Sequence, residues 1–293
     1  MENVIDIESL VKEYDGFRLN DISFSIPKGY ITGLVGPNGA GKTTIIKLIM
    51  NLIKRDGGTV KLFGLDNIDH DIAIKDRIGF VYDTPYFYED QDLQTLMSAI
   101  GPFYSKWDGK KFAMLLDRFG LSPRMKFKSL SKGTKTKFVL ALALSHEADL
   151  IILDEPTAGL DPLFRREFLE MLTEIIQNEE KSVLFSTHIT SDLDRAADFT
   201  VMIDNGTILC SLWKDEIQEK WGVVKGREDF ITKENMALFR GWRNHQYGFE
   251  ALTSDLPKVR QLSLKETLIE RPTLEDLLFY LHKGGQHGQT HIE

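Results

Sequence analysis

The sequence contains a single cysteine, Cys210, so no disulfide can form within the chain. It also lacks any uninterrupted apolar run near the roughly 18 residues that a membrane-spanning helix needs. Its first residues, MENVIDIESL, show no basic segment followed by an apolar one, which is the pattern of a signal peptide. We therefore expect a chain that does not cross a membrane, so any work at a membrane requires a second chain that does.

The sequence has no excess of positive charge, because its 36 Lys and Arg residues are outnumbered by 44 Asp and Glu residues. The net charge is −8. Proteins that bind nucleic acid usually present a basic face to the phosphates, so this balance argues against a nucleic-acid partner. The apolar fraction, 42% of 293 residues, is ordinary for a globular protein and suffices for one large domain and a small one.

The first two-thirds of the chain alternate between strand and helix patterns. Short apolar runs, typical of strands buried on both faces, lie at 30–35, 150–153 and 182–186. Apolar faces with helical spacing predict helices over 43–53 and 110–119. Strands separated by helices pair in parallel, so the pattern predicts an α/β fold. Asn205-Gly206, between two further β-rich runs, predicts a hairpin turn.

The strongest motif is Gly36-Pro37-Asn38-Gly39-Ala40-Gly41-Lys42-Thr43, which matches G-x-x-x-x-G-K-[ST] between a predicted strand and a predicted helix. Its glycines allow backbone N–H groups to converge on phosphate oxygens, and the helix that follows adds its positive end. We expect Lys42 to reach the β- and γ-phosphates and the Thr43 hydroxyl to bind Mg²⁺. Thr44 completes the set of nucleotide-binding candidates in this loop.

Two carboxylates, Asp154 and Glu155, follow directly after the apolar run at 150–153. This places both at the carboxyl edge of the sheet, where α/β proteins bind ligands. Asp154 suits Mg²⁺, through a water molecule, and Glu155 can polarise an attacking water. For the tripeptide Asp154-Glu155-Pro156 alone, a helix cap or turn is a plausible alternative. The phosphate loop upstream favours the chemical role.

With three further segments, these motifs resemble the ABC (ATP-binding cassette) ATPase family over about 4–208. Leu130-Ser131-Lys132-Gly133-Thr134 stands where the family has its LSGGQ signature, Ala158-Gly159-Leu160-Asp161 resembles the D-loop, and Ser186-Thr187-His188 resembles the switch histidine. The resemblance implies ATP and Mg²⁺ as cofactors. It also implies a P-loop NTPase core with an antiparallel β subdomain and a helical signature subdomain at about 84–146.

Within the family, the signature of one subunit covers the ATP held by the other, so the resemblance implies a homodimer or heterodimer with two composite sites. Ser131 and Gly133 would contact the γ-phosphate from across the interface, backed by a helix over roughly 135–145. Asp161 would help position the partner's site. His188 would hold the γ-phosphate in cis, which makes Glu155, His188 and Lys42 the candidate catalytic residues. Without the other motifs, His188 would be interpreted as a buried histidine at a strand end.

The family also has an aromatic residue that stacks on adenine, and Tyr14 stands in its place. Phe17 is a rival for that role, and surface packing is the alternative for Tyr14. Two departures from the family pattern matter more. Lys132 and Thr134 replace the usual Gly and Gln of the signature. Asp83 replaces the usual glutamine after the strand at 78–82, and it either binds the metal through a water or bonds to the loop backbone.

The pattern changes after about Leu212, which predicts an ABC ATPase domain at 1–212 and a small α+β accessory domain at 213–293. In the second part we expect helices over 214–220 and 229–239, strands over 222–225 and 247–252, and a polar, disordered tail over 284–290. The lysine-containing signature and the segment Pro272 to Leu277 resemble bacterial drug- or peptide-exporter cassettes whose permease is a separate chain. A leucine-patterned surface helix over 274–281 is the simpler interpretation of that segment.

Tyr86, Phe87 and Tyr88 make the loop after Asp83 unusually aromatic. In the family this region receives a short helix of the permease, and aromatic residues are enriched at such interfaces. Packing inside the helical subdomain is the alternative for each ring. The resemblance therefore implies a peripheral protein on the cytoplasmic side of the cell membrane.

The leading hypothesis is an ATPase that powers transport through this separate integral-membrane permease. A soluble ABC protein that acts on ribosomes or DNA is the alternative. Such chains usually carry two cassettes or a long coiled-coil insertion, whereas this one has a single cassette and no heptad run. A module that binds ATP without hydrolysing it is a third hypothesis, and Glu155 and His188 argue against it.

Overall fold

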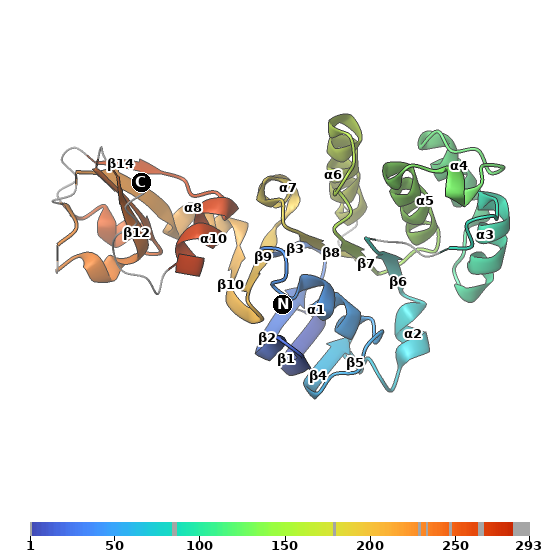
Figure 1. Cartoon of the computed structure of the whole chain (residues 1–293), viewed down its shortest axis with the longest axis horizontal. Helices are drawn as coiled ribbons and strands as arrows, with labels where there is room; N and C mark the ends of the chain where they lie inside the picture. The colour runs from blue at the N-terminus through green and yellow to red at the C-terminus, as the bar shows by residue number, and fades with distance from the viewer. Residues whose placement is uncertain are drawn as a thin grey trace.

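The computed structural model describes residues 2–83, 87–177, 180–227, 230–232, 234–245, 248–262 and 267–283. Within these ranges the strands form three sheets (Figure 1), of which the central one has six strands in the order β10-β9-β3-β8-β7-β6. No helix in the described ranges is both long and apolar enough to span a membrane.

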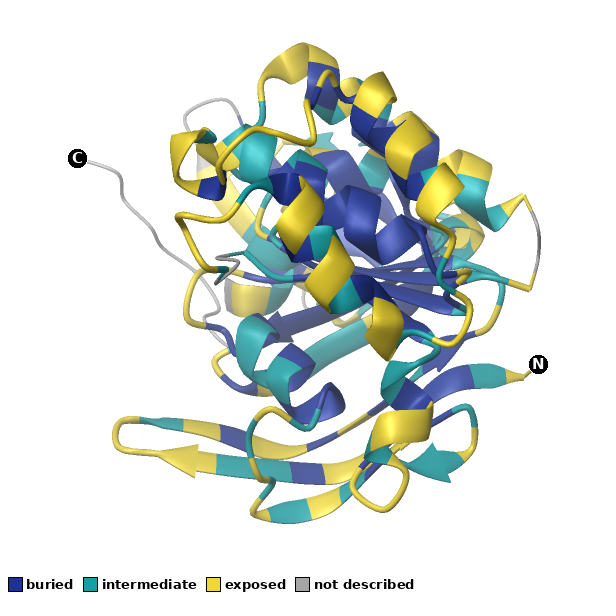
Figure 2. Ribbon diagram, turned by 90° about the vertical axis from the view of Figure 1, so that its right-hand side faces the viewer, coloured by how far each residue is buried: buried dark blue, intermediate teal, exposed yellow. Residues whose placement is uncertain are grey.

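The central sheet is made of β3 (Ile31–Val35), β6 (Ile78–Val81), β7 (Leu150–Asp154), β8 (Ser182–Thr187), β9 (Phe199–Asp204) and β10 (Thr207–Trp213). All neighbours in it pair in parallel except β10, which runs antiparallel to β9. Every residue of β3, β7 and β8 is buried, as expected for parallel strands covered on both faces, and Figure 2 shows the sheet as a dark blue centre. The predicted α/β fold is confirmed.

The helices α1 (Lys42–Ile49), α6 (Pro162–Ile176) and α7 (Thr190–Ala196) follow β3, β7 and β8. The prediction that α1 extends to Ile53 is wrong. Asn51 adopts a left-handed φ of 50°, and Leu52 N donates to Lys47 O at 2.8 Å, which closes the helix at its C-terminus.

An antiparallel sheet in the order β2-β1-β4-β5 packs beneath α1 (Figure 1). Its strands are β1 (Asn3–Tyr14), β2 (Phe17–Pro27), β4 (Gly57–Leu62) and β5 (Leu65–Asp66), and α2 (Asp71–Lys75) leads from it to β6. This is the antiparallel β subdomain that the family resemblance implies.

A helical unit lies at the other end of the central sheet, at the right of Figure 1. It contains α3 (Leu93–Ile100), η1 (Gly101–Phe103), α4 (Gly109–Arg118), η2 (Phe127–Ser129) and α5 (Lys132–Leu144). The buried rings of Phe112, Phe127 and Phe138 pack edge to face in its core. Helix α5 begins three residues earlier than predicted, because the Ser131 side chain accepts a hydrogen bond from Thr134 N and caps it.

The residues after β10 form a third, antiparallel sheet in the order β12-β13-β11-β14, at the left of Figure 1. The elements of this part are α8 (Lys214–Lys220), β11 (Gly222–Gly226), η4 (Met236–Leu238), β12 (Phe239–His245), β13 (Gly248–Thr253), α9 (Leu256–Val259), β14 (Leu268–Glu270) and α10 (Leu274–Lys283). Helix α8 and strand β11 agree with the sequence prediction. The predicted disordered tail lies outside the described residues.

The predicted helix over 229–239 is wrong. Asn235 Nδ2 donates to Phe230 O at 2.7 Å and Asn235 Oδ1 accepts from Thr232 N at 2.8 Å, so this side chain bonds the backbone in place of a helix. Phe239 opens strand β12 and is buried against the ring of Phe230.

Helix α10 returns to the first part of the chain and packs on α7. Leu274 N donates to Asp194 Oδ1 at 3.2 Å, and His282 Nδ1 forms a hydrogen bond with Asp204 Oδ2 at the end of β9. Leu277 has no exposed surface and belongs to the same apolar cluster as Leu193 of α7. The C-terminal elements therefore share a core with the central sheet.

Candidate nucleotide site

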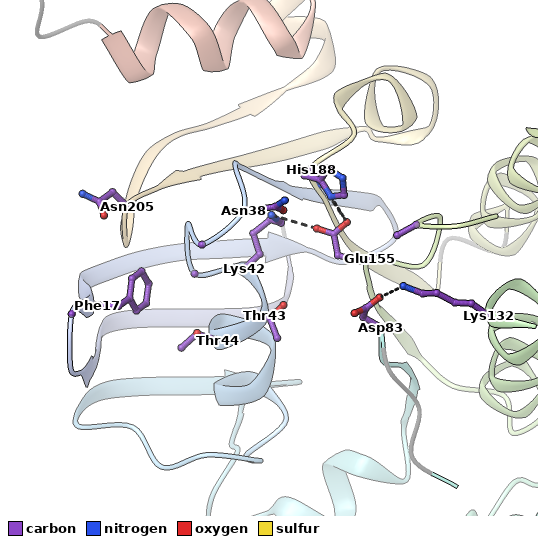
Figure 3. A pocket seen from close by; sticks show the side chains of 14 residues that line it. Phe17, Asn38, Lys42, Thr43, Thr44, Asp83, Lys132, Glu155, His188 and Asn205 are labelled. Atoms are coloured by element: carbon purple, nitrogen blue, oxygen red, sulfur yellow. Dashed lines mark hydrogen bonds and ion pairs between the residues drawn. The ribbon is translucent and has the colours of Figure 1, made fainter. Parts of the chain in front are cut away.

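Four loops meet at one edge of the central sheet because the strands before them run parallel. β3 leads into the phosphate loop, β6 into Asp83, β7 into Asp154 and Glu155, and β8 into His188 (Figure 3). The carboxyl ends of parallel strands lie on the same side of a sheet, which is where α/β proteins bind ligands. Segments far apart in the sequence therefore line one cleft.

The phosphate loop holds its lysine in place. Lys42 is 5% exposed, and its Nζ donates to Gly36 O at 2.8 Å and to Pro37 O at 3.2 Å. A Cβ on Gly36 would come within 2.0 Å of Ile203 O, so only glycine fits there. The loop is wound closely around an ammonium group at the N-terminus of α1, an arrangement that suits an anion.

The predicted hairpin at Asn205-Gly206 is confirmed and supports the same loop. Asn205 and Gly206 have φ values of 45° and 73°, as a tight turn between β9 and β10 requires. Gly206 N donates to Ala40 O at 3.0 Å, so the hairpin is bonded to the phosphate loop.

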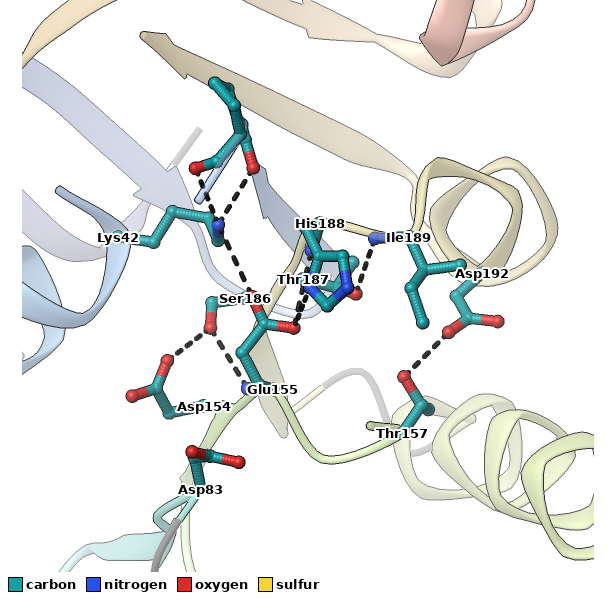
Figure 4. A network of polar contacts seen from close by, with 12 residues as sticks. Lys42, Asp83, Asp154, Glu155, Thr157, Ser186, Thr187, His188, Ile189 and Asp192 are labelled. Atoms are coloured by element: carbon teal, nitrogen blue, oxygen red, sulfur yellow. Dashed lines mark hydrogen bonds and ion pairs between the residues drawn. The ribbon is translucent and has the colours of Figure 1, made fainter. Parts of the chain in front are cut away.

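Glu155 lies at the centre of the cleft between a lysine and a histidine (Figure 4). Its Oε1 is 3.4 Å from Lys42 Nζ, and its Oε2 is 2.8 Å from His188 Nδ1. Its backbone has a φ of 48°, a conformation that a non-glycine residue keeps only when its surroundings hold it. The N–H of Glu155 donates to Ser186 O at 3.1 Å, which provides part of that hold.

Asp154 is completely buried beside Glu155. Its Oδ1 accepts hydrogen bonds from Ser186 Oγ at 2.6 Å and from Thr43 Oγ1 at 3.3 Å, while its Oδ2 has no hydrogen-bond partner among the described residues. Burial raises the pKa of Asp154 above its ordinary value, although the hydrogen bonds from Ser186 and Thr43 oppose the shift.

This buried oxygen and the Thr43 hydroxyl fit Mg²⁺, which prefers hard oxygen ligands. No group of three or more His, Cys, Asp or Glu side chains in the described ranges is arranged to hold a metal ion by itself. Mg²⁺ is commonly held by one or two protein oxygens together with substrate phosphates, and Thr43 and Asp154 match that requirement.

The cleft has a volume of about 780 Å³. Nine of the predicted site residues line it: Asn38, Gly39, Gly41, Lys42, Thr43, Thr44, Asp83, Glu155 and His188. The other predicted residues are not among its described lining: Tyr14, Gly36, Pro37, Ala40, Ser131, Gly133, Asp154 and Asp161. Gly16, Phe17, Lys132, Ala158 and Asn205 also line it, and of these only Phe17 had been considered as a ligand contact.

The two aromatic candidates for the adenine contact are placed differently. Phe17 lines the cleft, and its ring lies against Gly41, where an added Cβ would be 2.9 Å from Phe17 Cζ. Tyr14 is 47% exposed and lies near Lys12, whose Nζ is 5.4 Å from the ring centroid. The structure thus places the Phe17 ring against the phosphate loop, where it lines the cleft.

The signature and D-loop residues cap helices in this single chain. Ser131 caps α5, and Asp161 caps α6 by accepting from Leu163 N and Phe164 N at 3.2 and 3.0 Å. The Phe164 N–H is the main cause of a pKa of Asp161 below its ordinary value. A Cβ on Gly133 would lie 3.7 Å from Gly159 O, so the signature and the D-loop of one chain are neighbours.

Lys132 reaches from the start of α5 to the end of β6. Its Nζ is 2.9 Å from Asp83 Oδ1, and both side chains line the cleft (Figure 3). The two departures from the family pattern are therefore partners in one ion pair.

Comparisons with known proteins agree with this geometry. The model of the family described as ABC transporter matches residues 19–158. The ABC transporter ATP-binding protein YtrB of Bacillus subtilis is 30% identical over 236 residues, which are 80% of each chain. This chain belongs to the ABC transporter ATP-binding proteins. The bacitracin transport ATP-binding protein BcrA of Enterococcus faecalis is 33% identical over 71% of this chain and 69% of its own length.

A solved structure of an ATP binding subunit of an ABC transporter has the same fold as this family member. It aligns with a TM-score of 0.66 and 28% identity, over 73% of this chain and 92% of the other. The family and the fold that the motifs indicated are thus confirmed, and ATP is the ligand that this family binds.

Proposed function

We propose that this ABC protein hydrolyses ATP and that hydrolysis powers transport through a separate membrane permease. The observation that carries the proposal is the chain of contacts from Lys42 to Glu155 to His188 at the edge of the cleft. A lysine for the terminal phosphates and a carboxylate for the attacking water are parts that phosphoryl transfer to water requires. His188 lies within hydrogen-bond distance of that carboxylate.

In this mechanism the Glu155 carboxylate accepts a proton from water as the water attacks the γ-phosphorus, and the bond between the γ-phosphorus and the β–γ bridging oxygen breaks, so that ADP and inorganic phosphate leave. Lys42 leaves Glu155 for the phosphate oxygens, because the phosphates carry more negative charge than one carboxylate. Thr43 and Asp154 would hold Mg²⁺, which would neutralise charge on the β- and γ-phosphates. Phe17, in place of Tyr14, would contact the base.

The test of the proposed activity is Glu155→Gln. The variant keeps the shape of the side chain and loses the base, so it should bind ATP while its turnover falls about 10²- to 10⁴-fold. It should also accumulate as an ATP-bound dimer in size-exclusion chromatography. Glu174→Gln, on the outer part of α6, is the control and should hydrolyse ATP like the wild type. Near-normal turnover by Glu155→Gln would remove Glu155 from this role.

We further propose that two subunits share each site, with Ser131, Gly133 and Asp161 acting across the interface. A mixture of Lys42→Ala and Ser131→Arg subunits tests this, because one of the two sites in the mixed dimer carries neither change. ATPase activity that appears only on mixing supports sharing. Wild-type activity of Ser131→Arg as a monomer contradicts it.

The membrane partner is part of the same proposal, with the chain bound to the cytoplasmic face by its permease. Tyr88 is 82% exposed, whereas Phe87 packs against Phe127 and Phe138; Tyr86 lies outside the described residues. Tyr88→Ala should reduce recovery of the chain with membranes and leave its soluble ATPase activity intact, and Leu268→Ala, exposed on β14, should change neither. Unchanged membrane recovery of Tyr88→Ala would exclude this contact.

The proposed organisation is an ATPase domain at 1–212 and an accessory domain at 213–293. The relative BcrA carries bacitracin transport in its name, which supports transport as the process that hydrolysis powers. The alternative of a soluble protein acting on ribosomes or DNA gains no support from the relatives described above.

A further inference from the structure

A buried carboxylate, Asp192, ties together the three segments that carry the site. It lies in α7, four residues after His188, and is 2% exposed. Its Oδ2 accepts a hydrogen bond from Thr157 Oγ1 at 2.8 Å (Figure 4). Its Oδ1 accepts from Arg165 Nε at 2.7 Å and lies 2.6 Å from a second guanidinium nitrogen.

The partners of Asp192 come from the segment after Glu155 and from the helix after the D-loop. Thr157 is two residues beyond Glu155 and is itself 2% exposed. Arg165 lies in α6, four residues beyond Asp161, and its backbone N–H donates to Asp161 O at 2.9 Å. One side chain therefore joins the segment of the general base, the D-loop helix and the segment after the switch histidine.

The backbone conformation of Glu155 requires contacts that fix the segments on either side of it. Glu155 has a left-handed φ of 48°, which persists in a non-glycine residue only where neighbouring contacts determine it. On the N-terminal side the hold comes from Ser186, through its carbonyl and its hydroxyl. On the C-terminal side, the side-chain bond nearest to Glu155 is the buried one between Thr157 and Asp192.

We propose that Asp192 is a positioning residue, which fixes Glu155 and His188 relative to one another by binding Thr157 and Arg165 at once. The inference rests on the proposed ATPase function and adds to it a reason for the observed distance of 2.8 Å between Glu155 and His188. This buried carboxylate is rigid, because the Thr157 hydroxyl restricts its Oδ2 while two guanidinium nitrogens of Arg165 restrict its Oδ1. Movement of α7 is thereby coupled to the loop of the base.

The experiment changes the hydroxyl and leaves the carboxylate and its charge partner alone. Thr157→Val removes the hydrogen bond at nearly constant shape, and Thr157→Ser keeps the hydroxyl. We expect Thr157→Val to lower kcat about 10-fold, which corresponds to a loss of ~1.4 kcal/mol, with KM and ATP affinity within twofold of wild type. Thr157→Ser should recover most of the rate.

Thr253→Val is the matched control, because Thr253 is equally buried and its hydroxyl donates to Leu238 O at 2.8 Å, far from the cleft. It should cost as much stability as Thr157→Val and leave kcat unchanged. A loss of kcat in Thr253→Val equal to that in Thr157→Val would assign both effects to stability and overturn the proposal. So would a Thr157→Val rate equal to that of Thr157→Ser.

A second measurement does not depend on hydrolysis. Amide hydrogen exchange should become faster at 155–160 and 188–190 together in Thr157→Val, and in neither segment in Thr157→Ser or Thr253→Val. Arg165→Lys, which keeps the charge but cannot place two nitrogens on Asp192 Oδ1, should give the same pattern if Thr157→Val does not fold. Joint acceleration in a protein without ATPase activity would support the coupling and refute the proposed function. Acceleration at one segment alone would refute the coupling.

Discussion

Lys132 and Asp83 form an ion pair, with Lys132 Nζ 2.9 Å from Asp83 Oδ1, between the start of α5 and the end of β6. Both side chains are about half exposed, so the pair adds only about 0–1 kcal/mol to stability. Its position matters more, because both residues line the cleft and a metal ion near Asp154 would compete with Lys132 for the Asp83 carboxylate.

The first prediction follows from this competition. Lys132→Gln should lower the Mg²⁺ concentration for half-maximal ATPase activity about two- to fivefold, the equivalent of up to ~1 kcal/mol. Lys128→Gln, which removes an ion pair with Asp90 elsewhere in the helical unit, should not shift it. In an Asp83→Gln background the effect of Lys132→Gln should disappear. A shift that persists there would show that Asp83 is not the group for which lysine and metal compete.

The second prediction concerns the base contact. Phe17→Ala should weaken ATP binding about 10-fold or more, because stacking of a base on an aromatic ring is worth about 1–3 kcal/mol. Tyr14→Ala should change it less than twofold, since Tyr14 is outside the described lining of the cleft. Titration with a fluorescent ATP analogue measures both, and inorganic tripolyphosphate, which has no base, should bind all three proteins alike. The opposite ranking of the two variants would return the role to Tyr14.

The third prediction concerns the core that α10 shares with α7. Leu277→Ala should destabilise the chain by about 2–5 kcal/mol, the usual cost of emptying a buried leucine site. Because Leu277 and Leu193 belong to one apolar cluster, calorimetry should show a single transition at lower temperature. Leu268→Ala, on the exposed side of β14, should leave the transition in place. Two transitions, only one of them shifted, would mean that the C-terminal part unfolds independently.

The fourth prediction is a pH dependence in the third sheet. Glu250 is 3.1 Å from Lys225 Nζ and accepts from Arg243 Nε at 2.8 Å. Burial by itself raises the pKa of Glu250, but the contacts with Arg243 and Lys225 outweigh it and leave this pKa below its ordinary 4.5. A carboxyl with a lowered folded-state pKa stabilises the fold above the unfolded-state value and loses that contribution as pH falls through the folded-state value.

Glu250→Gln should therefore lower the free energy of unfolding at pH 7 by about 1 kcal/mol, and by much less at pH 3.5. The melting temperature should fall accordingly. Thermal denaturation at the two pH values is the measurement. Glu170→Gln, in an exposed pair on α6, is the control and should show no such difference. An equal loss at both pH values would attribute the effect to packing.

Local patterns predicted the parts of the site that lie at strand ends. The order of strand, glycine-rich loop and helix indicated Lys42 and Thr43, and an apolar run that ends in two carboxylates indicated Asp154 and Glu155, because these relations span only a few residues. The structure brings these residues together. Their roles in hydrolysis stay predictions until the variants are measured.

Other features depend on contacts between distant segments, which one sequence does not encode as a pattern. Asp83 and Lys132 were each noticed as departures, yet nothing local indicated that they would pair. Asp192 was missed because an acidic residue on a short helix is ordinary until Thr157 and Arg165 are placed beside it. The helix predicted over 229–239 failed for a local reason, since Asn235 bonds the backbone at Phe230 and Thr232.

The contacts that fix the Lys42 side chain have a consequence for the affinity of the cleft for a nucleotide. A free lysine side chain gives up about 1.5–2 kcal/mol of rotamer entropy when it is immobilised. Here Gly36 O, Pro37 O and Glu155 have already immobilised it as part of folding. A phosphate that binds here contacts an ammonium group that is already ordered, so binding only replaces Glu155 by the phosphate as the anionic neighbour of Lys42. The entropy cost of ordering Lys42 is therefore met during folding. A substitution that increases the mobility of the phosphate loop should weaken nucleotide binding mainly by adding this entropy cost to the binding step.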